Sequence, residues 1–145
     1  ATRDELSLIA VVMKAPTAAK RFSNATSLLD YGFNNFSYKT FAKQGDVVKT
    51  ITVNKGVQNE VNAVYETAPA LLIKKGEESN ITYDISLNDS IPAPVSQGQI
   101  LGTVTYSSNG NVLLTTNLVA ESAVEKSGFF NITKNIFSNW FNLLK

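Results

Sequence analysis

Apolar residues change their spacing along this chain, from a nearly continuous run to a helical period and then to alternation. Residues 6–13 form a nearly continuous apolar run that is rich in β-branched side chains, as expected for a strand that is covered on both faces. Over residues 17–33, apolar positions recur every three or four residues behind Thr17, a good N-cap. This period predicts one amphipathic helix, which we expect to pack against the preceding strand.

From about Tyr38 the pattern becomes alternating and is interrupted by regularly spaced turn residues, which is typical of an antiparallel sandwich or barrel. The alternation predicts strands over residues 47–53, 57–65 and 70–73. It is cleanest over residues 81–88, where it predicts a core-facing apolar set and a solvated polar set. The apolar set of this strand is Ile81, Tyr83, Ile85 and Leu87.

Two further signals organise the second half of this β region. Residues 99–106 and 112–120 flank Asn109-Gly110, a dipeptide that strongly favours a hairpin turn. Two prolines in residues 91–95 remove backbone donors, so this segment should cross between sheets rather than lie inside one. The predicted fold is mainly β: a small antiparallel β-sandwich of about six or seven strands, preceded by one strand and one amphipathic helix and followed by a C-terminal amphipathic helix.

The C-terminal segment, residues 129–145, combines apolar residues at helical spacing with a polar side that carries lysines and no acid. A spanning helix needs about 20 nearly unbroken apolar residues, so we expect this segment to lie in the headgroup layer of a membrane, where Trp and Phe are favoured. The candidate membrane-anchor residues are Phe129, Phe130, Ile132, Lys134, Ile136, Phe137, Trp140, Phe141, Leu144 and Lys145.

The same spacing fits two other arrangements of the C-terminal segment. It could be an amphipathic helix that docks on its own domain, or the interface of an oligomer. The pattern alone favours neither these alternatives nor the membrane anchor.

Composition excludes several classes of function. The chain has no histidine and no cysteine, which removes Ser-His-Asp arrangements, imidazole and thiolate metal sites, and cysteine nucleophiles. A net charge of +1, without a basic cluster interleaved with aromatics, argues against nucleic-acid binding.

Motifs of penicillin-recognising enzymes are nearly missing. No serine has a lysine three positions later, so the acyl-enzyme pattern S-x-x-K is not present. Lys126-Ser127-Gly128 fits K-[ST]-G, but a match of three residues is expected often by chance. We therefore expect no catalytic residue, no cofactor and no metal site on this chain.

A succession of short motifs nevertheless resembles a known family. In chain order, the motifs are LIAVVM at 8–13, APT at 15–17, RF at 21–22, LLDYGF at 28–33, APVSQGQ at 93–99 with Gly102, and VEKSGFF at 124–130. This succession resembles the closing strand and helix of the penicillin-binding domain in low-molecular-weight D-alanyl-D-alanine carboxypeptidases, followed by the β-rich C-terminal domain and membrane-binding tail of that family. The resemblance covers essentially the whole chain.

The resemblance implies three parts. Residues 1–36 would be the closing strand and helix of a penicillin-binding, transpeptidase-like domain, residues 37–125 a β-sandwich C-terminal domain, and residues 126–145 the amphipathic anchor helix. In that family the S-x-x-K, S-x-N and K-T-G elements all lie upstream of the strand at residue 6, in a region that this chain does not contain. No catalytic residue carries over.

The function implied by the resemblance is to hold another domain at a set place rather than to catalyse a reaction. The chain would be the non-catalytic spacer and membrane-anchoring region of a bacterial serine-type carboxypeptidase, whose upstream domain trims peptidoglycan stem peptides. Its partners would be that upstream catalytic domain and the anionic headgroups of a membrane surface. The implied location is extracytoplasmic, peripheral on the outer face of the cytoplasmic membrane.

A second interpretation comes from a different functional class. The chain could be a secreted β-sandwich binding module for cell-wall carbohydrate or a protein partner, with the terminal helix as an oligomer interface. Because an exposed apolar edge invites strand addition, we also expect residues 6–13 either to pair with a second copy of the chain or to pack with the following helix against the sandwich.

Overall fold

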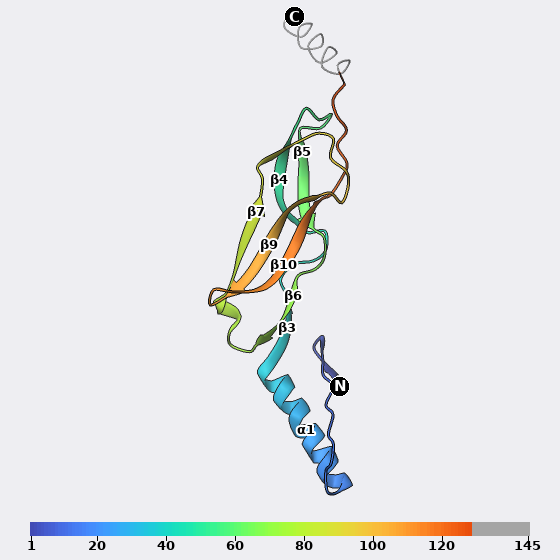
Figure 1. Cartoon of the computed structure of the whole chain (residues 1–145), viewed down its shortest axis with the longest axis vertical. Helices are drawn as coiled ribbons and strands as arrows, with labels where there is room; N and C mark the ends of the chain where they lie inside the picture. The colour runs from blue at the N-terminus through green and yellow to red at the C-terminus, as the bar shows by residue number, and fades with distance from the viewer. Residues whose placement is uncertain (129–145) are drawn as a thin grey trace, which may run out of the picture.

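The computed structural model describes residues 1–128 and consists of a β-rich body with one helix at its N-terminal end (Figure 1). The chain leaves this body at Gly128, at the end opposite to the helix. In chain order the elements are β1 (Thr2–Arg3), β2 (Leu6–Ser7), α1 (Ala18–Asn35), β3 (Phe36–Thr40), β4 (Val47–Asn54), β5 (Glu60–Tyr65), β6 (Ala70–Lys74), the 3₁₀ helix η1 (Glu78–Asn80), β7 (Ile81–Leu87), β8 (Ser90–Pro92), β9 (Ile100–Ser108) and β10 (Asn111–Ala120).

The predicted helix is confirmed as α1 and extends two residues beyond the predicted end. Thr17 is its N-cap, because the Thr17 Oγ1 accepts a hydrogen bond from the Lys20 backbone N–H at 3.2 Å. At its C-terminus the Phe36 N–H bonds the Gly32 carbonyl, and β3 starts at once. The helix therefore passes directly into the β body.

The prediction of one strand over residues 6–13 is wrong. Leu6 and Ser7 pair with β1 in a short antiparallel hairpin, and Leu8 exchanges two backbone hydrogen bonds with Ala1. Residues 9–13 then run alongside α1 without a ladder partner among the described residues. Residues 8, 10 and 12 are half-buried, whereas Ile9, Val11 and Met13 are 92%, 73% and 84% exposed. The segment packs on the helix as expected, but it does not reach the sandwich.

The largest described sheet has six strands in the order β7-β9-β10-β5-β4-β8. The predicted hairpin is confirmed by the pairing of β9 with β10. Asn109 and Gly110 have φ of 50° and 79°, as both central residues of a type I′ turn require. A second, two-stranded sheet pairs β3 with β6.

Strand β7 matches its predicted range, but its apolar face is only partly covered. Ile81 and Leu87 are half-buried and pack against the core, whereas Tyr83 and Ile85 are 67% and 39% exposed. The prediction of a fully core-facing set is thus wrong in the middle of the strand. These two side chains are exposed because β7 is an edge strand of the six-stranded sheet and has a neighbouring strand on one side only.

The segment with two prolines lies at the other edge of the same sheet. β8 pairs with β4 in parallel, and the chain then passes through a cis Ala93-Pro94 bond to Val95, which bridges to Val124. Residues 91–95 avoid the middle of a sheet, as expected, but the expectation that they cross between two sheets is wrong, because β8 and β9, which this segment joins, belong to the same six-stranded sheet.

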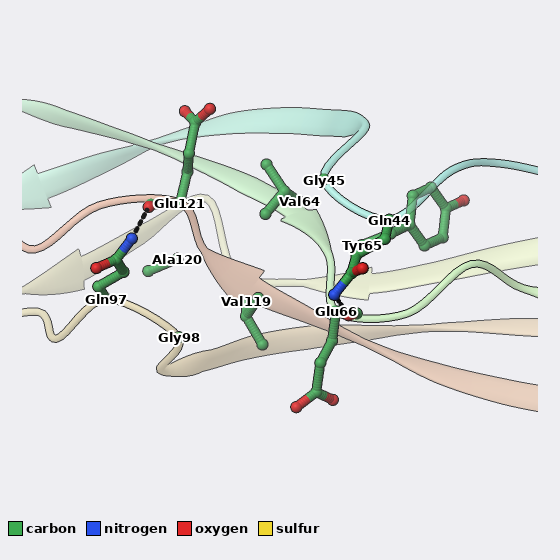
Figure 2. A pocket seen from close by; sticks show the side chains of 10 residues that line it. All are labelled: Gln44, Gly45, Val64, Tyr65, Glu66, Gln97, Gly98, Val119, Ala120 and Glu121. Carbon is green, nitrogen blue, oxygen red and sulfur yellow. Dashed lines mark hydrogen bonds between the residues drawn. The ribbon is translucent and has the colours of Figure 1, made fainter.

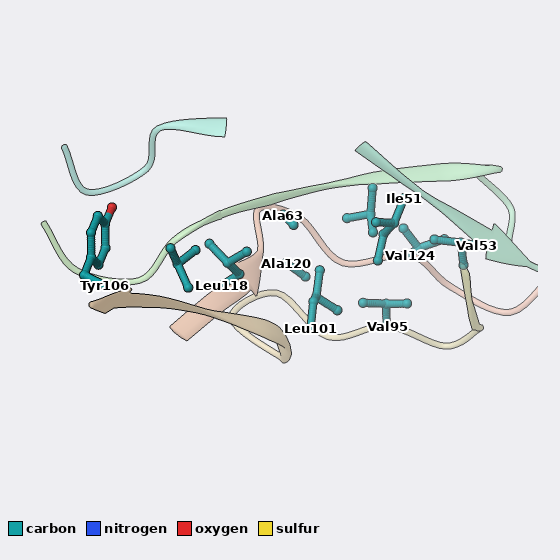
Figure 3. Close-up of a cluster of buried hydrophobic side chains, with 11 residues drawn as sticks. Ile51, Val53, Ala63, Val95, Leu101, Tyr106, Leu118, Ala120 and Val124 are labelled. Carbon is teal, nitrogen blue, oxygen red and sulfur yellow. The ribbon is translucent and has the colours of Figure 1, made fainter. Parts of the chain in front are cut away.

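The hydrophobic core lies inside the curl of the six-stranded sheet, where side chains of β4 and β5 meet those of β9 and β10 (Figure 3). Val95 and Val124 extend the core toward the end at which the chain leaves the body. The mainly β fold class with a preceding helix is confirmed, while the predicted C-terminal helix lies outside the described residues. The core consists of Ile51, Val53, Val61, Ala63, Val95, Leu101, Val104, Tyr106, Leu118, Ala120 and Val124.

Candidate functional site

The predicted anchor residues, Phe129 to Lys145, lie outside the described residues. What the structure shows is the surface from which this segment continues. We call this surface the tail end and define it by the exposed residues Lys55, Val57, Pro92, Pro94 and Lys126. It lies at the end of the β body opposite to α1 (Figure 1).

The tail end is held together by backbone hydrogen bonds between the β4–β5 turn and the last described residues. The Ser127 N–H donates to the Lys55 carbonyl and the Val57 N–H donates to the Glu125 carbonyl, both at 2.8 Å. One step further inside, Val95 and Val124 exchange two hydrogen bonds of 2.8 Å. Residues 124–127 are thus fixed to the sandwich.

Close packing at Gly56 keeps the β4–β5 turn against residue 124. A Cβ at Gly56 would lie 2.5 Å from the Gln58 carbonyl oxygen and 2.7 Å from the Val124 Cγ1, distances that require one of them to move. The glycine therefore permits this close approach.

Lys126-Ser127-Gly128, the short match to K-[ST]-G, belongs to this same backbone arrangement. Lys126 forms an antiparallel β-bridge with Gly56, and the Ser127 N–H donates to the Lys55 carbonyl. These contacts are structural, and none of them brings Ser127 to a base within the described residues.

The sequence did not reveal a shallow pocket of about 350 Å³ on the outer face of the β5–β10 pair (Figure 2). Strand pairing places Val64 opposite Val119, and two loops close the sides. The pocket is lined by Gln44, Gly45, Val64, Tyr65, Glu66, Gln97, Gly98, Val119, Ala120 and Glu121.

The carboxylates at this pocket already have partners. The Glu66 Oε2 accepts from the Asn117 Nδ2 at 2.7 Å, and the Glu121 Oε2 accepts from the Asn62 Nδ2 at 2.8 Å. The Gln97 amide donates to the Glu121 carbonyl at 3.1 Å. The pocket can recognise a ligand by shape and amide hydrogen bonds, but it lacks a free nucleophile with a base.

Two ionisable groups have shifted pKa values for structural reasons. Burial raises the pKa of Tyr106 above its ordinary value, and the hydrogen bond with the Tyr65 hydroxyl at 3.1 Å adds to this. The Lys49 ammonium, 2.6 Å from Asp89, lowers the pKa of that exposed carboxyl by hydrogen bonding and charge. Tyr106 packs against Phe41 with ring centroids 4.9 Å apart, so it is part of the core.

Residues 1–128 have neither a metal-binding cluster nor a membrane-spanning helix. In this part of the chain, acidic residues do not gather in groups of three that could bind a metal ion. Its helices are also too short or too polar to cross a membrane.

The opposite end of the molecule exposes apolar side chains. On α1, Phe22, Leu28 and Tyr31 are 70%, 53% and 63% exposed, in addition to the exposed side of residues 9–13. Exposed apolar side chains in this number are typical of a region that is covered by another domain or chain.

Comparisons with known proteins agree with this architecture. Residues 36–126 match the family described as penicillin-binding protein 5, C-terminal domain. The chain is 30% identical over 141 residues to D-alanyl-D-alanine carboxypeptidase DacF of Bacillus subtilis (strain 168) and 31% identical over 146 residues to DacC of Escherichia coli (strain K12). Each match covers 97% of this chain and 36% of the relative.

Among solved structures, penicillin binding protein 5 from Haemophilus influenzae superposes with a TM-score of 0.67 at 28% identity, covering 79% of this chain and 34% of that one. The chain thus spans about a third of the length of the relatives that it matches, and it corresponds to their C-terminal part.

Proposed function

The chain belongs to the family of penicillin-binding protein 5 C-terminal domains, and on this premise we propose that it is the non-catalytic spacer and membrane-anchoring region of a D-alanyl-D-alanine carboxypeptidase. The resemblance found in the sequence is confirmed by the family match and by relatives that carry this name. The activity of the parent protein, removal of D-alanine from peptidoglycan stem peptides, belongs in this proposal to an upstream domain.

The spacer role is supported by the way the β body joins its two neighbours. At one end α1 continues without a loop into β3, and the Lys75 ammonium donates to the Phe33 carbonyl at 2.8 Å. At the other end residues 124–127 are bonded to the β4–β5 turn. The core of the body reaches the second joint at Val124, and Leu71 of β6 packs against it from the side of the first joint. Such a body is suitable for holding two attached parts at opposite ends (Figure 1).

The proposed upstream partner is a catalytic domain that covers residues 1–36. The alternating exposure of residues 8–13 is that of an extended segment with one side on α1 and the other side uncovered. A neighbouring sheet would supply backbone partners for this segment, and its side chains would cover Ile9, Val11 and Met13. This assigns residues 1–36 to the catalytic domain, residues 37–125 to the spacer and residues 126–145 to the anchor.

The proposed anchor is the segment from Phe129 to Lys145, whose aromatic residues and lysines without acids suit a bilayer interface. Its partner would be the anionic headgroups of a membrane. The corresponding location is extracytoplasmic, peripheral on the outer face of the cytoplasmic membrane.

Vesicle flotation tests the anchor. The full chain should float with vesicles of phosphatidylcholine and phosphatidylglycerol, and Trp140→Asp or deletion of residues 129–145 should abolish flotation. Equal flotation of all three proteins would remove the anchor from the proposal. Separately, the chain should not be acylated by a labelled penicillin, and a covalent adduct would contradict the non-catalytic role.

A binding module is the second candidate, and the pocket on the β5–β10 face favours it (Figure 2). Its amide side chains, Gln44 and Gln97, could hydrogen-bond the hydroxyl or acetamido groups of a cell-wall glycan. Titration with soluble peptidoglycan fragments, with Gln97→Leu as the variant, tests this candidate. Binding that the variant weakens would support the module, and the absence of binding would exclude it.

A further inference from the structure

We propose that the tail end of the sandwich is itself a membrane-contacting surface, in which the β4–β5 turn touches an anionic phospholipid bilayer beside the anchor segment. The inference deepens the proposed function and rests on it, since the anchor would bring this surface to the lipid. It adds a second contact, made by residues of the folded body.

The tail end exposes apolar side chains to solvent. Val57 is 53% exposed although it lies in a turn whose backbone is fixed by the Glu125 carbonyl. Pro92 and Pro94 are exposed on the neighbouring segment, which is tied to the same turn because the Ala93 N–H donates to the Asn54 carbonyl at 2.9 Å. An aliphatic side chain on a rigid turn flanked by prolines can enter the headgroup layer with little loss of backbone entropy.

The tail end also carries two lysine side chains. Lys55 and Lys126 are both exposed and lie side by side, because the Lys55 carbonyl accepts from Ser127 and Lys126 bridges to Gly56. The exposed acid Glu125 directly precedes Lys126 and offsets part of their charge. The positive excess comes from the sequence that follows, because residues 129–145 include Lys134 and Lys145 and contain no acid.

The tail end is followed directly in sequence by the proposed anchor, which favours lipid as the partner of this surface. Gly128 is the residue after the fixed strip 124–127, and the apolar pattern of the anchor begins at the next position with Phe129 and Phe130. Phe129 follows Lys126 closely in sequence, and Lys126 forms a β-bridge with Gly56, between Lys55 and Val57. A surface that binds the two phenylalanines would therefore also be close to these three residues. For an anchor that lies in the bilayer interface, that surface is the headgroup layer.

The consequence is a defined orientation. An anchor alone would leave the β body free to pivot at Gly128, whereas a second contact at the β4–β5 turn resists this rotation. The long axis of the body, with α1 at its far end, would then point away from the bilayer (Figure 1).

A single-cysteine probe tests the contact directly, because the natural chain has no cysteine. Val57→Cys and Val112→Cys, each labelled with an environment-sensitive fluorophore, form a matched pair. Val112 is a 66% exposed valine at the start of β10, beside the β9–β10 turn on the α1 side of the body. In the full chain, vesicles of phosphatidylcholine and phosphatidylglycerol should shift the emission of the label at position 57 to shorter wavelength and leave the label at 112 unchanged.

Flotation of the same samples separates failure of the inference from failure of the proposed function. If the proteins float and neither label shifts, or both labels shift alike, the second contact is wrong while the anchor stands. If the proteins do not float, the anchor and the contact are both overturned.

A second pair of variants measures the contribution of the turn to affinity. Val57→Asp removes the apolar contact and adds repulsion, so it should weaken binding to the anionic vesicles about five-fold or more, whereas Val112→Asp should leave binding within about two-fold. Equal affinities of the two variants would overturn the inference. Unchanged unfolding midpoints in urea would show that Val57→Asp acts on binding, because Val57 is exposed.

Discussion

The backbone N–H of Ser127 donates to the carbonyl oxygen of Lys55 at 2.8 Å. This bond joins the last residues of the described chain to the β4–β5 turn, which is far from them in sequence. It shows how a β body can control the direction in which an attached segment leaves it.

Gly56→Ala should lower the free energy of unfolding by about 1–3 kcal/mol, because the new Cβ would meet the Gln58 carbonyl and the Val124 side chain. Gly128→Ala is the matched control, since a Cβ there meets nothing within 4 Å in the described part of the chain. Urea denaturation of both variants measures the difference. Equal midpoints would show that the β4–β5 turn is not closely packed against residue 124.

Lys75→Met should destabilise the joint between α1 and the β body by about 0.5–1 kcal/mol, because the Phe33 carbonyl near the helix C-terminus loses its cationic donor. Lys74→Met is the control, since Lys74 makes an exposed ion pair with Glu77 at 3.6 Å, which contributes little. Hydrogen exchange at the last turn of α1 measures the local effect. The same protection in both variants would contradict the role given to Lys75.

The stability of the β body should fall above pH 10 because of Tyr106. Burial raises the pKa of this phenol in the folded state above its ordinary value of 10.0, so the unfolded chain ionises first and is favoured as pH rises. Below pH 10 this contribution is fully present. Urea unfolding of Tyr106→Phe should show a weaker fall between pH 9 and 11 than the natural chain, whereas Tyr38→Phe, at a site 43% exposed, should behave as the natural chain does.

The uncovered apolar surface of residues 9–13 and α1 should make the chain self-associate when no catalytic domain covers it. Val11→Asp combined with Phe22→Asp should weaken this association, because both side chains are at least 70% exposed. Sedimentation velocity at increasing concentration measures it, with Val112→Asp as the control. A natural chain that stays monomeric at every concentration would contradict the prediction.

Local signals in the sequence predicted those elements whose causes are local. The Thr17 cap and the Asn109-Gly110 turn each act within a few residues, and both elements appear as expected. Residues 6–13 have the composition of a buried strand, but a strand also needs a neighbour to pair with. The sequence pattern carried no information about whether that neighbour is present.

Two other features depend on tertiary neighbours. The exposure of Tyr83 follows from the position of β7 at a sheet edge, which alternation cannot reveal. The pocket forms because strand pairing brings the loops at Gln44 and Gln97 to the same face, although they are far apart in sequence. The anchor was predicted from periodicity alone, and it stays a prediction because residues 129–145 lie outside the described part of the chain.

The fluorescence of Trp140, the single tryptophan of the chain, reports directly on contact between residues 129–145 and lipid. On addition of phosphatidylcholine–phosphatidylglycerol vesicles to the full chain, its emission should move to shorter wavelength and be quenched by lipids brominated near the headgroup. An emission spectrum that vesicles and brominated lipids leave unchanged would contradict the claim that residues 129–145 bind a membrane.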